Sequence, residues 1–262
     1  EGMMDFTRCN ECKKRHVPQI LFSTLESPYF YVGGGGEQSS FQPYLIDAYV
    51  CRGKKTKEGE NNASNVSDAI PFIEYDLHRQ LLYKMRLKGF NALFDFTIRL
   101  YVGESFVVAV ATGTGYFLHA LPRPTPLKIF RSLQVKDDED RELIQIQEKL
   151  MKISTANRDV IDEIVERQNE STASNASSSD TSTSSEDDEE AIEIDDDTDE
   201  DLMSILMDPE LPSNFVIISS NPPNDTSISI GFGNFFSFSK QATISPFSIH
   251  TNKHVAAVFK EL

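Results

Sequence analysis

Residues 71–124 change abruptly from a helical pattern to a strand pattern, and this change constrains the fold more than any other feature. Apolar residues recur every four positions in the first part, which predicts a helix with one buried stripe of Ile73, Leu77, Leu81 and Met85. Ser67 and Asp68 are its expected caps, and Pro71 suits its first turn, where no amide partner is needed. Gly89 supplies the left-handed residue that is expected to end the helix.

The second part of this stretch predicts a long β-hairpin. Residues 92–101 are rich in aromatic and β-branched side chains, residues 102–105 form the expected turn, and residues 106–112 are a nearly continuous apolar strand. A fully apolar strand needs cover on both faces. The helix can cover one face, so the other is expected to pack against the earlier strands or another subunit.

Gly113, Thr114 and Gly115 follow the apolar strand, in the place where a phosphate-binding loop would lie. The full dinucleotide fingerprint and the lysine of a phosphate-binding loop are both missing. We therefore expect a bulge or bend here, which lets the strand continue to Leu121.

Two more strands are predicted ahead of the helix, at residues 17–25 and 45–52. Four consecutive glycines, Gly33–Gly36, lie in the loop between them, and the polar residues 54–67 lead into the helix. The order over residues 1–130 is therefore β-β-α-β-β. This order predicts an α+β domain in which a mixed or antiparallel sheet packs on one main helix.

Residues 131–168 are predicted to contain an amphipathic helix. Its inner positions alternate in steps of three and four and include one polar residue: Leu143, Ile146, Leu150, Ile153, Asn157, Val160 and Ile164. Two interpretations fit this seam. The helix either docks on the α+β domain or forms a short coiled coil with a partner.

Residues 169–201 are mostly Ser, Thr, Asp and Glu, which predicts a disordered acidic linker. The tract carries 14 acidic residues and no basic one between Glu170 and Asp201, which leaves 27 acids against 25 bases elsewhere. That near-neutral remainder gives no indication of a nucleic-acid-binding surface. Ser184 and Ser185 each precede an acidic residue by three positions, which makes them candidate phosphorylation sites; the alternative is an unmodified linker.

Apolar residues at the end of the acidic tract alternate with acids, as in short docking motifs. The candidates for contact with a protein partner are Ile192, Ile194, Leu202, Ile205 and Leu206. Alternatively, these residues re-enter the next folded region. We expect residues 202–262 to hold a short docking helix and the start of a truncated further region, because the chain begins and ends abruptly.

Cys9 and Cys12 form the sharpest chemical motif in the sequence. Thiolates at this spacing fit one zinc ion, and the basic residues 13–15 would ease their deprotonation. Cys51 and His16 are the candidates for the two further ligands of a closed site. Otherwise the pair is a lone knuckle whose partner ligands lie outside this sequence, and a redox role is a weaker alternative.

The sequence contains no recognisable set of acid, base and nucleophile, so we expect no enzyme activity. His78 and His119 have no positioned nucleophile or second base beside them. The chain has three cysteines, no signal-peptide pattern and no apolar run of membrane-spanning length. These features indicate a reducing, cytoplasmic setting.

Several short motifs together carry a resemblance to a known family. They are Arg8-Cys9-x-x-Cys12-Lys13-Lys14, Pro71-Phe72-x-Glu74-Tyr75, Leu87-Lys88-Gly89-x-Asn91-Ala92-Leu93-Phe94, Val102-Gly103-Glu104, Ala111-Thr112-Gly113, Ala120-Leu121-Pro122 and Ile194-Asp195-Asp196. With these motifs the chain resembles the C-terminal part of the C2 domain-containing protein 5 family, including its YbjQ-like α+β domain. The serine-rich acidic insertion and the phenylalanine-rich end depart from that pattern.

The resemblance implies a non-enzymatic scaffold in insulin-stimulated vesicle fusion with the plasma membrane and in glucose transporter translocation. It implies a cytoplasmic protein, peripheral at the plasma membrane and vesicles. Calcium and phospholipid binding would come only from an amino-terminal C2 domain that this sequence lacks. The implied partners are other proteins, sister domains of the same chain or a second copy, with no nucleic acid, and zinc is the one cofactor considered for this segment.

Overall fold

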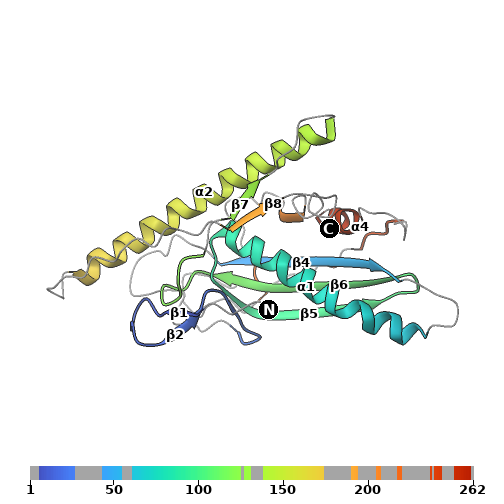
Figure 1. Ribbon diagram of the computed structural model, residues 1–262, viewed down its shortest axis with the longest axis horizontal. Coiled ribbons are helices and arrows are strands. Elements are labelled where there is room, and N and C mark those ends of the chain that lie inside the picture. Colours follow the sequence, from blue (N-terminus) through green and yellow to red (C-terminus); the bar gives the residue numbers. More distant parts are fainter. Residues whose placement is uncertain are drawn as a thin grey trace.

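The computed structural model describes residues 6–26, 43–54, 61–124, 127–130, 138–173, 190–193, 205–207, 217–219, 237, 239–243 and 251–260. In chain order its elements are β1 (Phe6–Arg8), β2 (His16–Pro18), β3 (Leu21–Phe22), β4 (Tyr44–Gly53), α1 (Asn62–Lys88), β5 (Ala92–Val102), β6 (Phe106–Tyr116), β7 (Leu127–Phe130), α2 (Asp138–Ala173), β8 (Glu190–Glu193) and α4 (Thr251–Lys260). The fold is α+β, with a mixed sheet against one main helix, as the sequence predicts (Figure 1).

Helix α1 begins earlier than the sequence predicts. Its N-cap is Asn61, whose side-chain oxygen accepts a hydrogen bond from the backbone N–H of Ala63. The prediction of caps at Ser67 and Asp68 is therefore wrong, and Pro71 lies inside the helix. Proline lies there on the exposed side of a long helix, where it removes one intrahelical hydrogen bond and crowds the carbonyl of Ser67.

The end of α1 and its buried stripe agree with the prediction. Gly89 adopts the left-handed conformation with a φ of 77°, and its N–H bonds the carbonyl of Arg86. The stripe residues pack against inward-facing residues of the sheet; together they form a core of Ile46, Ala48, Val50, Ile73, Leu77, Leu81, Met85, Val107, Ala109 and Ala111. One helix and one sheet face therefore hold the domain together.

The main sheet has the strand order β3-β5-β6-β4. β6 pairs antiparallel with β5 and with β4, whereas the short β3 runs parallel to β5. The strand predicted at residues 17–25 is two strands, β2 and β3, and β2 pairs with β1 in a separate ribbon. Pro18 explains the break, because it has no N–H with which to continue the ladder.

β6 runs through Gly113, Thr114 and Gly115 but ends at Tyr116, before the predicted Leu121. The irregularity in register lies on the partner strand β5, between Phe94 and Thr97. A Cβ atom on Gly115 would lie 2.7 Å from the ring of Phe90. This glycine therefore provides packing space for an aromatic side chain and does not cradle a phosphate.

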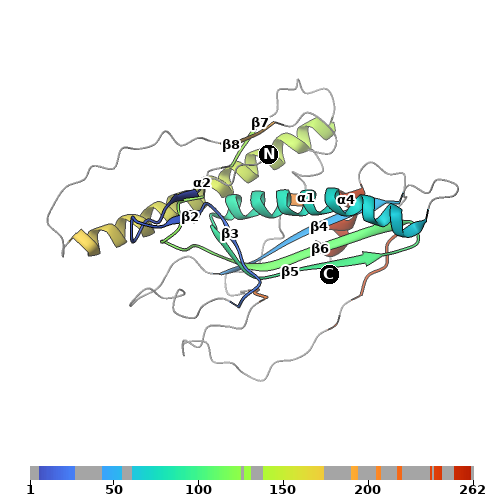
Figure 2. The same cartoon turned by 60° about the horizontal axis from the view of Figure 1, so that its bottom comes forward.

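Helix α2 docks on the domain, which is one of the two interpretations of its seam. Leu150 is buried against Leu87 of α1, and the side-chain amide of Asn157 donates to the Leu87 carbonyl at 2.9 Å. Figure 2 shows α1 lying on one face of the sheet, with α2 beyond it. The helix spans Asp138–Ala173, so it continues past the predicted end at residue 168.

The outer edge of β4 is covered by groups from three distant parts of the chain. Gln80 of α1 bonds both the N–H and the carbonyl of Tyr49, at 3.1 and 3.0 Å. The N–H of Cys51 donates to Asn252 of α4 at 2.8 Å, and the N–H of Leu45 donates to the carbonyl of Ile217 at 2.9 Å. These contacts occupy the backbone groups with which another strand would pair.

Candidate functional site

Cys9 and Cys12 lie in a tight turn at the end of β1. The turn is closed by a hydrogen bond from the N–H of Lys13 to the carbonyl of Cys9 at 3.0 Å, with a positive φ of 56° at Lys13. Hydrogen bonds from the backbone N–H groups of Lys14 and Arg15 lower the pKa of the Cys12 thiol, and the Cys9 side chain adds another hydrogen bond. Cys9 is buried and Cys12 is exposed. The turn thus favours a thiolate at Cys12.

The other two predicted zinc ligands do not complete this site. Cys51 lies in β4 opposite Val108, whereas the cysteine turn is bonded through Asn10 to Ala120, beyond the far end of β6. That separation corresponds to about 25 Å along the strand. Within the described ranges no group of three or more His, Cys, Asp or Glu residues could hold a metal ion. Cys51 is therefore not part of the cysteine site, and burial raises the pKa of its thiol to about 11.

His16 is an exposed residue of β2, paired with Arg8. It is close in sequence to the cysteine turn but gathers with it into no group of three metal-binding side chains among the residues that the structure describes. His78 has a packing role: its ring nitrogen bonds the Glu74 carbonyl at 2.8 Å, and its ring meets Phe22 edge-on.

Two of the predicted docking residues are buried inside this chain. Ile205 and Leu206 are nearly inaccessible, and Leu206 packs against Leu87 and Leu150. The prediction that these two contact a separate partner is wrong, because both side chains are already buried within this chain. The sequence alternative, re-entry into the fold, is the correct one.

Ile192 also has a neighbour within the chain, because β8 pairs in parallel with β7 and brings Ile192 opposite Ile129. Part of the predicted disordered tract, Glu190–Glu193, is therefore a strand. The candidates Ile194, Leu202, Ser184 and Ser185 lie outside the described residues.

The most exposed apolar surface of the sheet lies on β5. Ile98, Leu100, Tyr101 and Val102 are 44%, 42%, 53% and 50% exposed. Ile98, Leu100 and Val102 pair with Ala111, Ala109 and Val107, so they share the sheet face on which α1 packs. Helix α1 lies over β4 and β6 and leaves this side of the face uncovered.

The backbone of the same segment is also open. β3 and the residues after it bond β5 only as far as Phe96, and no strand among the described residues pairs with the outer edge beyond it. Residue pairs along an antiparallel hairpin alternate between those that exchange hydrogen bonds and those that do not. The N–H of Gly103 donates to the carbonyl of Phe106, and this bond fixes which residues of β5 are bonded to β6. By that alternation, Ile98, Leu100 and Val102 direct their N–H and carbonyl groups away from β6. We call residues 97–102 the β5 edge.

Sequence reasoning placed the assembly surface on the neighbouring strand. The predicted apolar strand, residues 106–112, is the central part of β6 and is flanked by β5 and β4. Its residues are buried or half-buried, so it is not an open surface. The sequence did contain a signal for the β5 edge. Polar and apolar residues alternate along Thr97, Ile98, Arg99 and Leu100, a pattern that is typical of a strand whose apolar face packs against another part of a protein.

Residues 14–124 match the family model described as C2 domain-containing protein 5, YbjQ-like domain, so this part of the chain is similar to that domain. The chain is 32% identical over 234 residues to C2 domain-containing protein 5 of Xenopus tropicalis, 33% over 232 residues to that of Pongo abelii and 32% over 232 residues to that of Homo sapiens. These findings confirm the resemblance to that family.

Each alignment covers 80% of this chain and 22% of the relative. The chain thus spans less than a quarter of the length of these curated relatives. No solved structure matches it. None of the described helices is long and apolar enough to cross a membrane.

Proposed function

We propose that this chain is a non-enzymatic assembly module of a trafficking scaffold. In this proposal the protein that contains it binds phospholipid in a calcium-dependent way through a separate C2 domain. It acts in insulin-stimulated vesicle fusion with the plasma membrane and in glucose transporter translocation. Its location is cytoplasmic and peripheral at the plasma membrane and vesicles. The kinship with C2 domain-containing protein 5 supports the class of protein, and the β5 edge supports the assembly role.

The β5 edge is suited to pairing with a strand of another domain. An added strand would form backbone hydrogen bonds with Ile98, Leu100 and Val102, and its side chains would cover the apolar surface beside α1. We propose that the partner is a sister domain of the same protein or a second copy of this domain. Arg99 is the single charged residue of the edge, which limits unspecific association without blocking a chosen partner.

Light scattering during size-exclusion chromatography tests this role. We expect the 262-residue chain to associate as its concentration rises, and Leu100→Lys to remain monomeric, because the lysine places a charge in the pairing surface. The whole chain is needed, since Leu206 and Asn252 pack onto the domain from beyond residue 168. Tyr75→Lys is the matched control, because Tyr75 is 66% exposed on α1 and lies outside the β5 edge.

A cellular experiment tests the trafficking part separately. In insulin-responsive cells, the full-length protein would be replaced by its Leu100→Lys form. We expect less glucose transporter at the cell surface after insulin, and a normal level with Tyr75→Lys. Equal transporter levels in cells with both variants would contradict the role of this edge, whatever the state of the isolated chain.

The cysteine turn supports a second candidate function, a zinc-binding structural module. The backbone N–H groups directed at Cys12 stabilise a thiolate, which is the form that binds zinc. In this version Cys9 and Cys12 supply two ligands and the remaining ligands come from another segment of this chain. Native mass spectrometry of protein purified without chelator is the test. One retained zinc ion that is lost in Cys12→Ser supports this candidate, and metal-free protein contradicts it.

A further inference from the structure

The β5 edge has a sequence that is complementary to itself. On either side of Leu100, the second residue is aliphatic and β-branched, Ile98 or Val102, and the residues between are Arg99 and Tyr101. Ile98, Leu100 and Val102 lie on the sheet face that carries α1, whereas Arg99 and Tyr101 lie on the opposite face. Two antiparallel edges would therefore join aliphatic residues on one face, and an arginine with a tyrosine on the other.

The apolar surface beside the edge extends onto α1. The ring of His78 contacts that of Phe96, so the side of α1 that carries His78 faces β5. Ile70 lies two turns earlier on the same side and is 40% exposed. β5 runs back along α1 (Figure 2), with Ile70 about 12 Å from His78 along the helix and Leu100 about 14 Å beyond Phe96. Ile70 and Leu100 are therefore level, and a partner at the edge would cover both.

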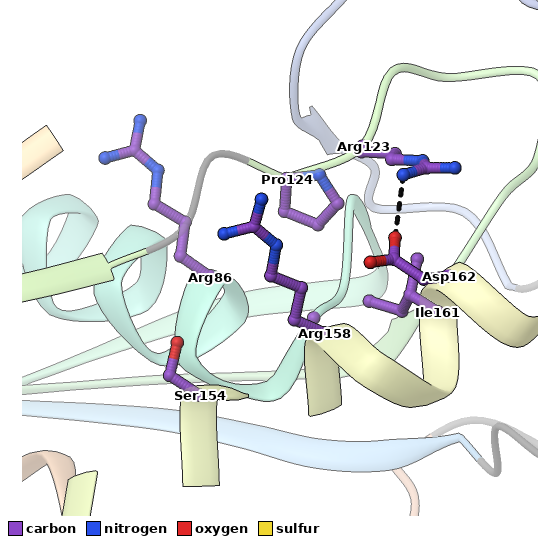
Figure 3. Close-up of a pocket in the computed structure, with 8 residues that line it drawn as sticks. Arg86, Arg123, Pro124, Ser154, Arg158, Ile161 and Asp162 are labelled. Atoms are coloured by element: carbon purple, nitrogen blue, oxygen red, sulfur yellow. Dashed lines mark hydrogen bonds and ion pairs between the residues drawn. The ribbon is translucent and has the colours of Figure 1, made fainter. Parts of the chain in front are cut away.

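Helix α2 leaves the β5 edge clear, because it is held at the other end of α1. Arg123, which follows β6, donates to Asp162 of α2 at 2.7 Å, and Gly89 lines the pocket between the two helices (Figure 3). Leu150 of α2 packs against Leu87 in the last turn of α1. The β5 edge lies beside the first half of α1, so the docked helix does not occupy the space that a partner needs.

The backbone of the edge limits the registers that a second antiparallel copy can adopt. The outward N–H and carbonyl groups belong to Ile98, Leu100 and Val102, so these three residues have to pair among themselves. A pairing centred on Ile98 would place Leu100 opposite Phe96. The N–H of Phe96 already donates to the Ser23 carbonyl at 3.0 Å, so this register is blocked.

The side chains select one of the three remaining registers. A pairing centred on Arg99 would place the two arginines opposite each other, and like charges in that position are destabilising. A pairing centred on Tyr101 would leave Ile98 opposite the turn of the hairpin. The pairing centred on Leu100 sets Ile98 opposite Val102 and Arg99 opposite Tyr101. It is the register in which every residue from 98 to 102 meets a suitable neighbour.

We propose that two copies of this chain join through their β5 edges as an antiparallel pair, with Leu100 opposite Leu100. The inference rests on the proposed assembly role and names the partner as a second copy. On the face that carries α1, Ile98 meets Val102 of the second copy. On the other face, the guanidinium of Arg99 lies over the ring of the second copy's Tyr101 in a cation–π contact. The pair is two-fold symmetric, and the two sheets form one.

Cysteine cross-linking of the 262-residue chain tests the register, with Cys12→Ser in every variant because Cys12 is exposed. Opposed residues of a bonded pair have Cα atoms about 5.5 Å apart, a separation that a disulfide spans. Leu100→Cys should therefore cross-link with itself when copper phenanthroline is added as oxidant. Ile98→Cys should cross-link when it is mixed with Val102→Cys, and neither should do so alone.

Ile98→Cys and Val102→Cys alone are the matched controls, because these positions are 44% and 50% exposed and Leu100 is 42% exposed. Equal yields from the three single variants would indicate random collision and contradict the pairing. A cross-link between Ile98→Cys and Leu100→Cys that exceeds that of Leu100→Cys alone would place the centre at Arg99. That result would overturn the proposal too.

An exchange of side chains tests the opposite face. Tyr101→Arg places an arginine opposite Arg99 of the second copy, so the dissociation constant of the pair should rise about tenfold or more. Arg99→Tyr combined with Tyr101→Arg restores an arginine opposite a tyrosine, and its dissociation constant should return to that of the unmodified chain. Both positions are exposed, so the variants are expected to fold, and their unfolding temperatures verify this. A double variant that associates no better than Tyr101→Arg would contradict the register.

Light scattering on the same samples separates this inference from the proposed function. A chain that stays monomeric at every concentration contradicts both. Association that is lost in Leu100→Lys, without a cross-link in Leu100→Cys, would keep the β5 edge as an assembly surface and overturn the self-pairing. Association together with that cross-link supports both.

Discussion

At the scale of single residues, the roles that could be predicted are those that depend on neighbours in the sequence. Gly89 and the stripe of Ile73 and Leu77 follow from helix periodicity and a C-cap, so they are where the sequence places them. The start of α1 was not recognisable from the sequence. The Asn61 cap lies in a run of polar residues, and Pro71 is a residue type that is common in the first turn of a helix although it lies inside this one. The roles of Gly113 and Gly115 depend on Leu93 and Phe90, which only the folded sheet brings close.

The two cysteines with shifted pKa values should differ in reactivity. Cys12 has a lowered pKa and is exposed, so its thiolate is populated at a lower pH than usual and iodoacetamide should alkylate it quickly near neutral pH. Cys51 has a pKa of about 11 and is buried, so it should stay protonated and unreactive up to strongly alkaline pH. Peptide mass spectrometry across pH 6–9 measures the rates.

The same alkylation in denaturant provides the control, since unfolding removes both the hydrogen bonds of Cys12 and the burial of Cys51. The two rates should then converge. A Cys51 that reacts as fast as Cys12 in the folded chain would contradict the environment described for β4.

At the scale of elements, the sequence predicted the helices and strands that have a clear periodic pattern of apolar residues. It missed the elements that form only because they pair with another part of the chain. The helix and the β5–β6 hairpin have long regular patterns, whereas β3 has only two residues and exists because it lies beside β5. The segment after β6 has no regular pattern of its own. Asn91 positions it: its side-chain amide donates to the carbonyls of Leu118 and Pro122 at 2.9 and 3.0 Å.

Replacing Asn91 should therefore destabilise the segment after β6. Asn91 also accepts from the N–H of Leu118 at 2.7 Å and is fully buried, so Asn91→Ala removes three hydrogen bonds and leaves the Leu118 N–H and the Pro122 carbonyl without these partners. We expect the free energy of unfolding to fall by about 2–4 kcal/mol. Urea denaturation measures the loss.

Asn10→Ala is the comparison for that experiment, because Asn10 makes one side-chain hydrogen bond to the same segment, to the Leu121 carbonyl at 2.8 Å. Its loss should be about 1 kcal/mol. If Asn91→Ala proved no worse than Asn10→Ala, Asn91 would not be the organising residue of this segment.

At the scale of the whole molecule, the sequence divided the chain too sharply into domain, helix, linker and tail. Its charge runs and apolar blocks were visible, but the surface that each block meets is a property of the folded chain. Ile205 and Leu206 have the composition of a docking motif, and in the structure both are buried, with Leu206 packed between α1 and α2. Residues from the tail also reach β4, through Ile217 and Asn252.

The tail should thus contribute to the stability of the domain. Leu206→Ala removes a side chain that is 1% exposed in a cluster with Leu87 and Leu150, and it should lower the free energy of unfolding by about 2–5 kcal/mol. Leu25→Ala, at a position that is 73% exposed, should change it little. Thermal and urea unfolding of both variants measure the difference, and equal stabilities would contradict the burial of the tail.

The closed edge of β4 limits the stoichiometry of any assembly built on this sheet. A sheet that can be extended at both ends can propagate into a fibre, because each added unit presents a new acceptor. Here Gln80, Asn252 and Ile217 block one end, so a unit that joins at the β5 edge presents only its own blocked end outward. Growth through this edge stops at a pair, which suits a module that has to join domains without polymerising.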